Sequence, residues 1–233
     1  MIGTLINTAT IVVGGGLGLL LGSRLSEKLK NTVIAGLGIF TTVYGISLFL
    51  KTENSLIVLG SVLIGVLLGE WWRIEDGLNH LGVWLESKFN RGESGAGQKD
   101  FIKGFVTASL VFCIGPMAIL GSIEDGLTGN FNTLAVKAIL DGFAAMAFAS
   151  SLGVGVIFSA VMVLFYQGAI TLLAGQVQNI ATASMMNELT ATGGVILVAL
   201  AISSLLEIKK IRTGSFLPAL LVAPLIVWVI SLF

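Results

Sequence analysis

The sequence predicts an all-α polytopic membrane protein with about eight transmembrane helices. Its apolar segments are long, its charged residues are few, and its basic residues gather in particular loops. Hydrophobic residues make up 55% of the 233-residue chain and charged residues only 11%, whereas a soluble domain carries about 25% charged residues. Apolar surface on this scale has to be hidden from water, so the lipid bilayer is the first expected partner.

The apolar segments are long enough to be membrane-spanning helices. A helix needs about 20 mostly apolar residues to cross the hydrocarbon core, and only helices and closed barrels satisfy their backbone hydrogen bonds there. Because the segments are not short and alternating, we expect helices. The predicted spans are 3–22, 32–50, 55–72, 102–121, 133–151, 153–174, 188–206 and 214–232.

The ends of several spans carry their own signals. No charge and no small-x-small cleavage site precede Arg24, so the first span is expected to be a retained helix and not a cleaved signal. Trp71 and Trp72 close the third span, as aromatic residues at a membrane interface do. The fifth and sixth spans are divided only by the tight turn predicted at Ser150-Ser151-Leu152-Gly153.

The basic residues predict the orientation of the chain. Lys and Arg in short loops favour the cytoplasmic side, and eleven of the thirteen basic residues fall in the first, third and seventh loops. Only Lys51 and Lys137 lie elsewhere. With eight spans these loops share one side, which predicts a multi-pass protein of the inner (cytoplasmic) membrane with both termini on the non-cytoplasmic side.

The third loop is the one sizeable soluble feature of a chain that is otherwise a single transmembrane domain over residues 1–233. Within residues 73–100 we expect a cytoplasmic interfacial helix followed by a flexible linker over 91–99. The apolar residues that recur at near-helical spacing are Ile74, Leu78, Leu81, Leu85 and Phe89.

The first three spans and the next three show a weak correspondence. The pattern from Gly3 to Gly14 resembles that from Gly104 to Gly115, and units of three helices must have opposite orientations. The sequence therefore suggests an inverted 3+3 repeat followed by two C-terminal helices, an arrangement that builds many secondary transporters. Chance similarity between apolar helices is the alternative, and the thirty glycines also suit close helix packing.

The composition argues against several functional classes. Thirteen basic residues balance thirteen acidic ones, so the net charge does not point to nucleic acid. The only cysteine, Cys113, lies in an apolar run, and the only histidine, His80, lies on the predicted surface helix. These counts exclude an internal disulfide and a Cys/His metal cluster. We therefore expect no metal, no other cofactor, no catalytic residues and no enzymatic activity.

Asp141 is the strongest candidate for a functional residue. It lies within the fifth span, where an ionisable side chain is costly and is by default a functional hypothesis. Lys137 precedes it by four residues and so shares its helical face. The alternative is an ion pair that only holds helices together.

Other polar or irregular positions could join Asp141 in one cavity. In the fourth span, Gly115 and Pro116 interrupt the helix, because proline lacks an N–H donor and clashes with the preceding turn. A broken helix at a binding site and a simple kink are both consistent with this pattern. The polar candidates for solute or ion binding are Asn7, Thr8, Ser109 and Glu188, although such groups also form hydrogen bonds between helices. Glu124 and Asp125 fall in a predicted outer loop, where they would be solvated or would collect cations.

Several segments resemble the bacterial YdfK/YqgA family. They are Ala108–Ser122, Asp125-Gly126, Lys137-Ala138 with Asp141-Gly142, Gly3-Thr4 with Asn7, and Glu188 with Gly193-Gly194. The resemblance covers nearly the whole chain and implies a multi-spanning membrane protein. It supplies no substrate and no catalytic residues.

The sequence is consistent with two main functions, and an intramembrane enzyme is a third, weaker hypothesis. The first is a transporter or channel for an ion or small polar solute, with a site near the bilayer midplane at the broken helix and Asp141. The alternative is a non-transporting membrane scaffold or regulatory subunit that uses the cytoplasmic loop to bind a partner. Self-association into a homo-oligomer is a further expectation for a small glycine-rich bundle.

Overall fold

The helices of this protein form two compact units. The computed structural model describes residues 1–22, 26–77, 80, 83–84, 96–114, 116–176 and 182–232. The first unit comprises Met1–Leu37 and Leu81–Asn179, and the second comprises Gly38–His80 and Ile180–Phe233. The boundary falls inside α2 (Glu27–Phe49). The single transmembrane domain predicted over residues 1–233 stays a prediction.

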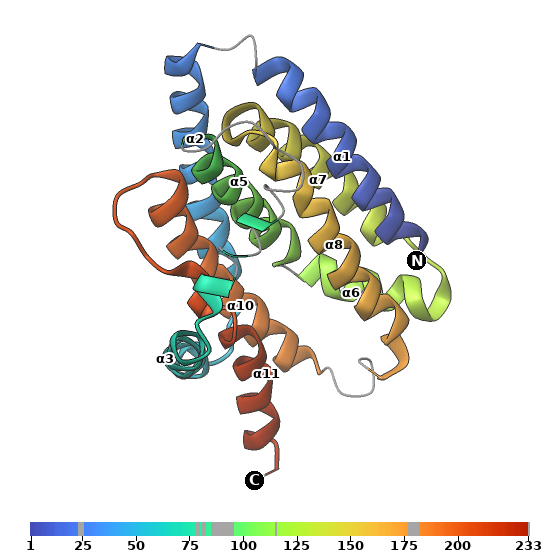
Figure 1. Ribbon diagram of the computed structural model, residues 1–233. Helices are drawn as coiled ribbons and strands as arrows, with labels where there is room; N and C mark the ends of the chain where they lie inside the picture. The colour runs from blue at the N-terminus through green and yellow to red at the C-terminus, as the bar shows by residue number, and fades with distance from the viewer. Residues whose placement is uncertain are drawn as a thin grey trace. The chain divides into compact units, whose positions relative to one another are not determined.

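The first unit is built around α1 and α7, which lie side by side in Figure 1. The helix α1 also contacts α8, α5 packs mainly against α8, and α6 packs against α7 and α8. The bounds of these helices are Ile2–Gly22 for α1, Ala96–Cys113 for α5, Pro116–Thr128 for α6, Asn132–Leu152 for α7 and Gly155–Leu172 for α8.

Glycines at four-residue spacing bring the backbones of α1 and α7 together. A Cβ atom added at Gly14, Gly18 or Gly22 would overlap a carbonyl oxygen of α7, so only glycine permits this approach. The paired positions rise together along both helices, which therefore run parallel. The pairs, with the distance from the added Cβ to the carbonyl oxygen, are Gly14 with Gly142 at 2.1 Å, Gly18 with Met146 at 2.3 Å, and Gly22 with Ser150 at 2.4 Å.

The predicted division between the fifth and sixth spans is confirmed. The helix α7 ends at Leu152, and Gly153 has φ +80°, a left-handed conformation that a residue with a Cβ rarely adopts. The Gly153 N–H donates to the carbonyl oxygen of Ala149 at 3.1 Å. The chain then reverses into α8, which begins at Gly155.

The fourth predicted span is broken where the sequence indicated. Its two parts, Phe101–Cys113 and Met117–Thr128, are bent by 61° relative to each other. Gly115 lies outside the described residues, and Pro116 is the first residue of α6. The helix α6 continues to Thr128, so Glu124 and Asp125 lie on a helix and not in the outer loop that we predicted.

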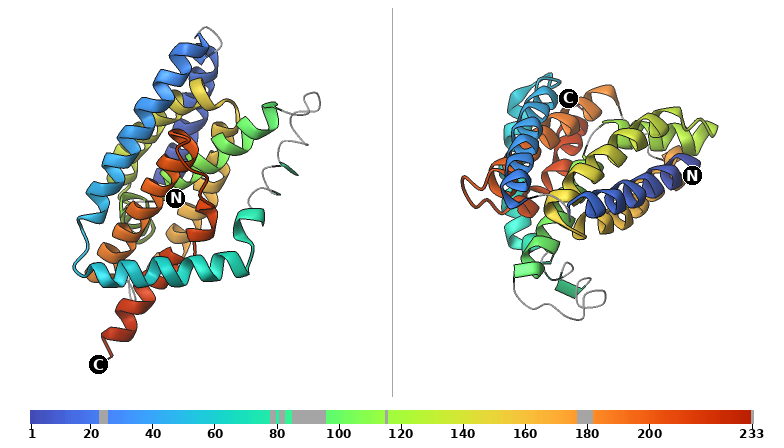
Figure 2. Two further views of the ribbon diagram at one scale, coloured as in Figure 1. Left: turned by 90° about the vertical axis from the view of Figure 1, so that its left-hand side faces the viewer. Right: turned by 90° about the horizontal axis from the view of Figure 1, so that it is seen from above.

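The second unit packs α11 against α10 and α3, and in Figure 2 α3 runs across the direction of α10. Here too glycines allow close crossings, since a Cβ added at Gly194 would lie 2.4 Å from the Gly45 carbonyl oxygen of α2. The elements are α3 (Ser55–Trp71), α10 (Ala183–Leu200), a π-helix (Ala201–Leu205), a 3-10 helix (Thr213–Phe216) and α11 (Ala219–Ile230).

Side-chain caps fix the first residues of two helices in this unit. Asn54 accepts a hydrogen bond from the Leu56 N–H at 3.1 Å at the start of α3. Thr182 accepts one from the Met185 N–H at 3.2 Å at the start of α10. Each cap provides a partner for a backbone donor that has none within the helix, so both helices begin at defined residues.

The all-α membrane architecture is confirmed, whereas the number of spans stays a prediction. Among the described residues, six helices are long and apolar enough to cross a membrane, or up to seven if the bent pair forms one span. The third predicted span corresponds to α3, which is an apolar helix of 17 residues. The inverted repeat likewise stays a prediction.

The predicted interfacial helix is described only in part. Residues 74–77, 80, 83 and 84 are helical, whereas 85–95 lie outside the described residues. Residues 96–99, which we predicted as linker, are helical and begin α5. Trp71 and Trp72 are strongly exposed at the end of α3, as expected of aromatic side chains at a membrane interface.

Candidate functional site

Lys137 and Asp141 form an ion pair inside the first unit. They lie one turn apart on α7, so their side chains share one face, and the Lys137 ammonium donates to the Asp141 carboxylate. Lys137 is 6% exposed and Asp141 is 8% exposed. The predicted pair is therefore present and enclosed by protein.

Two carboxamides from other helices extend this pair. Asn7 of α1 donates through Nδ2 to the Asp141 carboxylate at 3.0 Å and to Gln167 Oε1 of α8 at 3.3 Å. Both Asn7 and Gln167 are fully buried. We call the set of Lys137, Asp141, Asn7 and Gln167 the polar cluster. It joins α1, α7 and α8 at one place inside the first unit.

The ionised carboxylate determines how the two carboxamides are oriented. Because a carboxylate only accepts hydrogen bonds, Asn7 must turn its NH₂ group toward Asp141, and Gln167 must then turn its oxygen toward the same NH₂ group. Two buried atoms of these side chains remain without a hydrogen-bond partner, namely Asn7 Oδ1 and Gln167 Nε2. An unpartnered buried polar atom of this kind costs about 1–3 kcal/mol.

The two parts of the broken span pack against helices that carry the polar cluster. Both α5 and α6 contact α7 and α8. Two hydroxyl groups of α5, on Thr107 and Ser109, are buried and have no hydrogen-bond partner. Unpartnered polar groups therefore come from α5 as well as from α1 and α8.

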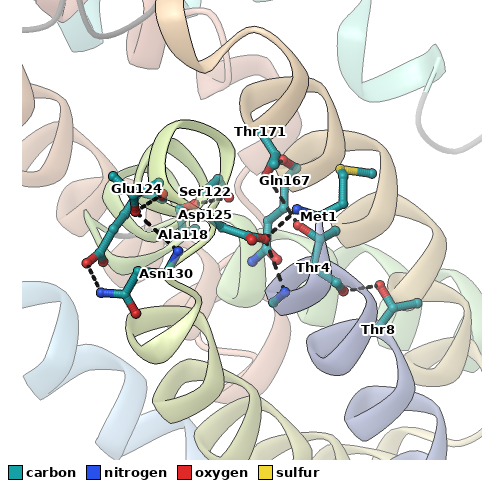
Figure 3. Close-up of polar contacts among 12 residues, drawn as sticks. Met1, Thr4, Thr8, Ala118, Ser122, Glu124, Asp125, Asn130, Gln167 and Thr171 are labelled. Atoms are coloured by element: carbon teal, nitrogen blue, oxygen red, sulfur yellow. Dashed lines mark hydrogen bonds and ion pairs between the residues drawn. The ribbon is translucent and has the colours of Figure 1, made fainter.

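A second buried carboxylate, that of Asp125, binds the start of α1. It accepts a hydrogen bond from the Gly3 N–H at 3.1 Å and pairs with the Met1 amino group at 2.8 Å. Figure 3 shows Asp125 reaching from α6 toward Met1. A carboxylate at a helix N-terminus is favourable because it faces the positive end of the helix dipole. Asp125 thus fixes one end of α1, and we did not foresee this role.

Glu188 performs a similar task in the second unit. Its carboxylate accepts from the Thr52 hydroxyl at 2.6 Å, from the Glu53 N–H at 2.8 Å and from the Asn54 N–H at 3.0 Å. The residue is almost fully buried in α10. It holds the turn that precedes α3 and belongs to a different unit from Asp141.

The structure brings together only some of the predicted site residues. Lys137, Asp141 and Asn7 come together, whereas the Thr8 hydroxyl donates to the Thr4 carbonyl oxygen of its own helix at 2.8 Å. Ser109 is buried on α5 with its hydroxyl unpartnered, and Glu188 holds the start of α3. Of the two residues at the break, Gly115 lies outside the described residues and Pro116 begins α6.

Gln167 is the member of the polar cluster that sequence reasoning missed. It is a single carboxamide in the middle of the apolar helix α8, and a strongly polar side chain at that depth is itself a signal of function.

Two hollows flank α7, and Asp141 lines neither of them. The first is an apolar groove of about 350 Å³ beside Thr10, Gly14 and Gly142. The second has about 290 Å³ and is lined in part by Lys30, Ser150 and Ser151. The four side chains of the polar cluster are buried and line neither hollow.

Comparison with known proteins decides the family. The family model described as "Protein of unknown function (DUF554)" matches residues 2–228. The chain belongs to the DUF554 family. This confirms the resemblance that the sequence suggested.

Two curated relatives match the DUF554 chain over nearly its whole length. "Uncharacterized protein YqgA" of Escherichia coli (strain K12) is 32% identical over 223 residues, covering 96% of this chain and 94% of the relative. "Uncharacterized membrane protein YdfK" of Bacillus subtilis (strain 168) is 29% identical over 237 residues, covering 100% of this chain and 98% of the relative. No solved structure gives a significant match. Together with the apolar helices, these relatives establish a multi-pass membrane protein of the DUF554 family.

Proposed function

We propose that this protein is an integral membrane transporter or channel for an ion or a small polar solute. The observation that carries the proposal is the polar cluster, in which Asn7 and Gln167 from two other helices meet the Lys137–Asp141 pair of α7. Three segments that are distant in sequence thus direct polar groups to one enclosed place. Such convergence supports a binding site at this place.

The energetic cost of the ion pair supports a functional role. Charged side chains within a membrane are costly and usually mark a substrate or ion pathway. Replacing a buried ion pair by apolar residues of similar volume is often neutral or stabilising. Helix packing alone would thus be served as well by an apolar pair at Lys137 and Asp141.

The unpartnered atoms of the polar cluster support a bound solute. Asn7 Oδ1 and Gln167 Nε2 are fully buried without partners, although buried polar groups in folded proteins are nearly always hydrogen-bonded. A polar solute or a water molecule at the cluster would supply the missing partners and remove the cost.

The bend between α5 and α6 is a third source of support. Discontinuous helices whose free backbone groups bind a solute are common at the sites of secondary transporters. Here the 61° bend separates α5 from α6, and both of these helices pack against α7 and α8, which carry Lys137, Asp141 and Gln167.

We also propose that the chain crosses the inner membrane eight times with both termini on the non-cytoplasmic side. In the first unit, α1 and α7 run parallel, as the first and fifth of eight spans must. In the second unit, Glu188 contacts Thr52, and both belong to predicted outer ends. Arg212 pairs with Glu70 at 2.8 Å, and both belong to predicted cytoplasmic ends.

The test of the proposed function is ligand-dependent stability. Purified wild type and Asp141→Asn are unfolded thermally in the presence of cations, anions, amino acids and small neutral solutes. A compound that binds only the folded state stabilises it by about 2.7 kcal/mol at a hundred times its dissociation constant. We expect one compound to stabilise the wild type and not the variant. If no compound stabilises the wild type, the scaffold alternative takes precedence.

A further inference from the structure

The substrate class of the polar cluster follows from the charges and hydrogen bonds already satisfied within it, provided that the proposed function holds. The two charged side chains of the cluster, Lys137 and Asp141, neutralise each other. The atoms of the cluster left without partners are Asn7 Oδ1 and Gln167 Nε2. Neither carboxamide carries a net charge.

The two unpartnered carboxamide atoms have opposite hydrogen-bonding character. Because the Asp141 carboxylate only accepts, Asn7 is left with a free acceptor, Oδ1, and Gln167 is left with a free donor, Nε2. A solute that satisfies both must donate one hydrogen bond and accept another.

A permanent ion fits this arrangement poorly. An ion that leaves water needs a counter-charge or many oriented dipoles, because burying an unpaired charge is far more costly than burying a hydrogen-bonded neutral group. In the polar cluster both charges are already paired with each other. An ion would have to break this pair, whereas a neutral solute would leave it in place and exchange its hydrogen bonds with water for those of Asn7 and Gln167.

We propose that the polar cluster binds a small uncharged solute of amide type, which donates to Asn7 Oδ1 and accepts from Gln167 Nε2. Urea and acetamide represent this class. The Lys137–Asp141 pair then acts as a positioning element, because it orients Asn7 and, through Asn7, Gln167.

The test measures permeation in vesicles of phosphatidylethanolamine and phosphatidylglycerol that contain the purified full-length protein. Stopped-flow light scattering follows entry of urea and acetamide, and ion-sensitive dyes follow Na⁺, K⁺ and Cl⁻. The variants are Gln167→Met, which removes the free donor, and Gln176→Met, the same change at an exposed position beyond α8. Circular dichroism and size-exclusion chromatography establish that each protein is folded, and Asn7→Leu, which removes the free acceptor Oδ1, replaces Gln167→Met if that variant does not fold.

We expect wild type and Gln176→Met to admit urea or acetamide at least tenfold faster than protein-free vesicles, and Gln167→Met to lose most of this acceleration. Ion entry should be unchanged by the protein. Ion entry that depends on Gln167, without entry of either neutral solute, would overturn the substrate class and leave the transport function standing. If the folded wild type moves neither neutral solutes nor ions, both proposals are overturned.

Discussion

Asn7 Nδ2 lies 3.0 Å from a carboxylate oxygen of Asp141, although the two residues are 134 positions apart in the sequence. The hydrogen bond crosses between α1 and α7, whose glycine-lined contact holds the two backbones together. Asn7 also donates to Gln167 of α8, so one amide group joins three helices. The stability of the first unit and the chemistry of the polar cluster therefore depend on the same residues.

Asp141→Asn should destabilise the protein strongly. The substitution leaves the buried ammonium of Lys137 without a counter-charge, and breaking one side of a buried pair costs about 3–5 kcal/mol. Thermal unfolding followed by tryptophan fluorescence measures the loss. The double variant Lys137→Met/Asp141→Leu removes both charges and should recover most of the stability while failing to respond to solutes. A double variant as unstable as Asp141→Asn would contradict this account of the pair.

Gly18→Ala should disrupt the contact between α1 and α7. The added Cβ would lie 2.3 Å from the Met146 carbonyl oxygen, and overpacking of this kind costs about 1–3 kcal/mol. The control is Gly16→Ala on the same helix, where a Cβ meets nothing within 4 Å. Gly18→Ala should unfold at a clearly lower temperature than Gly16→Ala. Equal unfolding temperatures would show that the two helices are not packed as described.

Glu188→Gln should weaken the second unit. Its carboxylate holds the Thr52 hydroxyl and the N–H groups of Glu53 and Asn54, and hydrogen bonds to a charged group are worth about 1.5–3 kcal/mol each. Because the amide retains one acceptor oxygen, we expect a loss of about 1–3 kcal/mol in thermal unfolding. The control is Glu124→Gln on α6, whose carboxylate accepts from the side chains of Asn130 and Thr133 but, within the described part of the chain, holds no backbone N–H group. If Glu188 were instead a solute ligand, its replacement would change solute binding and leave the unfolding temperature unchanged.

The stability of the turn before α3 should depend on pH. The hydroxyl of Ser184 and, to a smaller extent, the amide of Asn187 donate to the Glu53 carboxylate and lower its pKa. A carboxyl with a lowered folded-state pKa contributes stability that is fully present above its unfolded-state pKa of about 4.3 and is lost as the pH falls through the folded value. The double variant Ser184→Ala/Asn187→Ala should therefore unfold at a lower temperature than the wild type at pH 6. The difference between the two unfolding temperatures should shrink below about pH 4. A difference that stays constant across this range would rule out Glu53 as its source.

Thr107→Val should leave stability unchanged or raise it slightly. The Thr107 hydroxyl is buried without a partner, and replacing such a group by an apolar one of the same shape removes a desolvation cost. Thr171→Val is the matched control, because the Thr171 hydroxyl donates to the Gln167 carbonyl oxygen at 2.8 Å and its loss should cost about 1 kcal/mol. Chemical unfolding of both variants in detergent gives the comparison. A large loss for Thr107→Val would mean that its hydroxyl has a structural partner.

Local sequence signals predicted the features that depend on neighbouring residues. The turn at Gly153 and the break at Pro116 follow from the backbone properties of glycine and proline. The Lys137–Asp141 pair follows from helical spacing. Each of these needs only a few consecutive residues to be recognised.

Features that depend on tertiary packing could not be predicted in the same way. The partnership of Asn7 with Asp141 requires knowing that α1 lies parallel to α7. Glu188 has the composition of a solute ligand, yet its carboxylate binds backbone N–H groups that come from another part of the chain. Asp125 was expected in an outer loop because nothing nearby indicates that α6 continues to Thr128.

The measurement that tests the polar cluster most directly is the thermal unfolding of Gln167→Met with and without solutes. The variant removes the unpartnered Nε2 but also removes the acceptor of one Asn7 N–H, so its unfolding free energy should stay within about 1 kcal/mol of the wild type. We predict that it unfolds near the wild-type temperature and no longer responds to the solutes that stabilise the wild type. If the variant instead unfolds at a much lower temperature and is still stabilised by the same solutes as the wild type, Gln167 only holds helices together. That result would contradict the solute site.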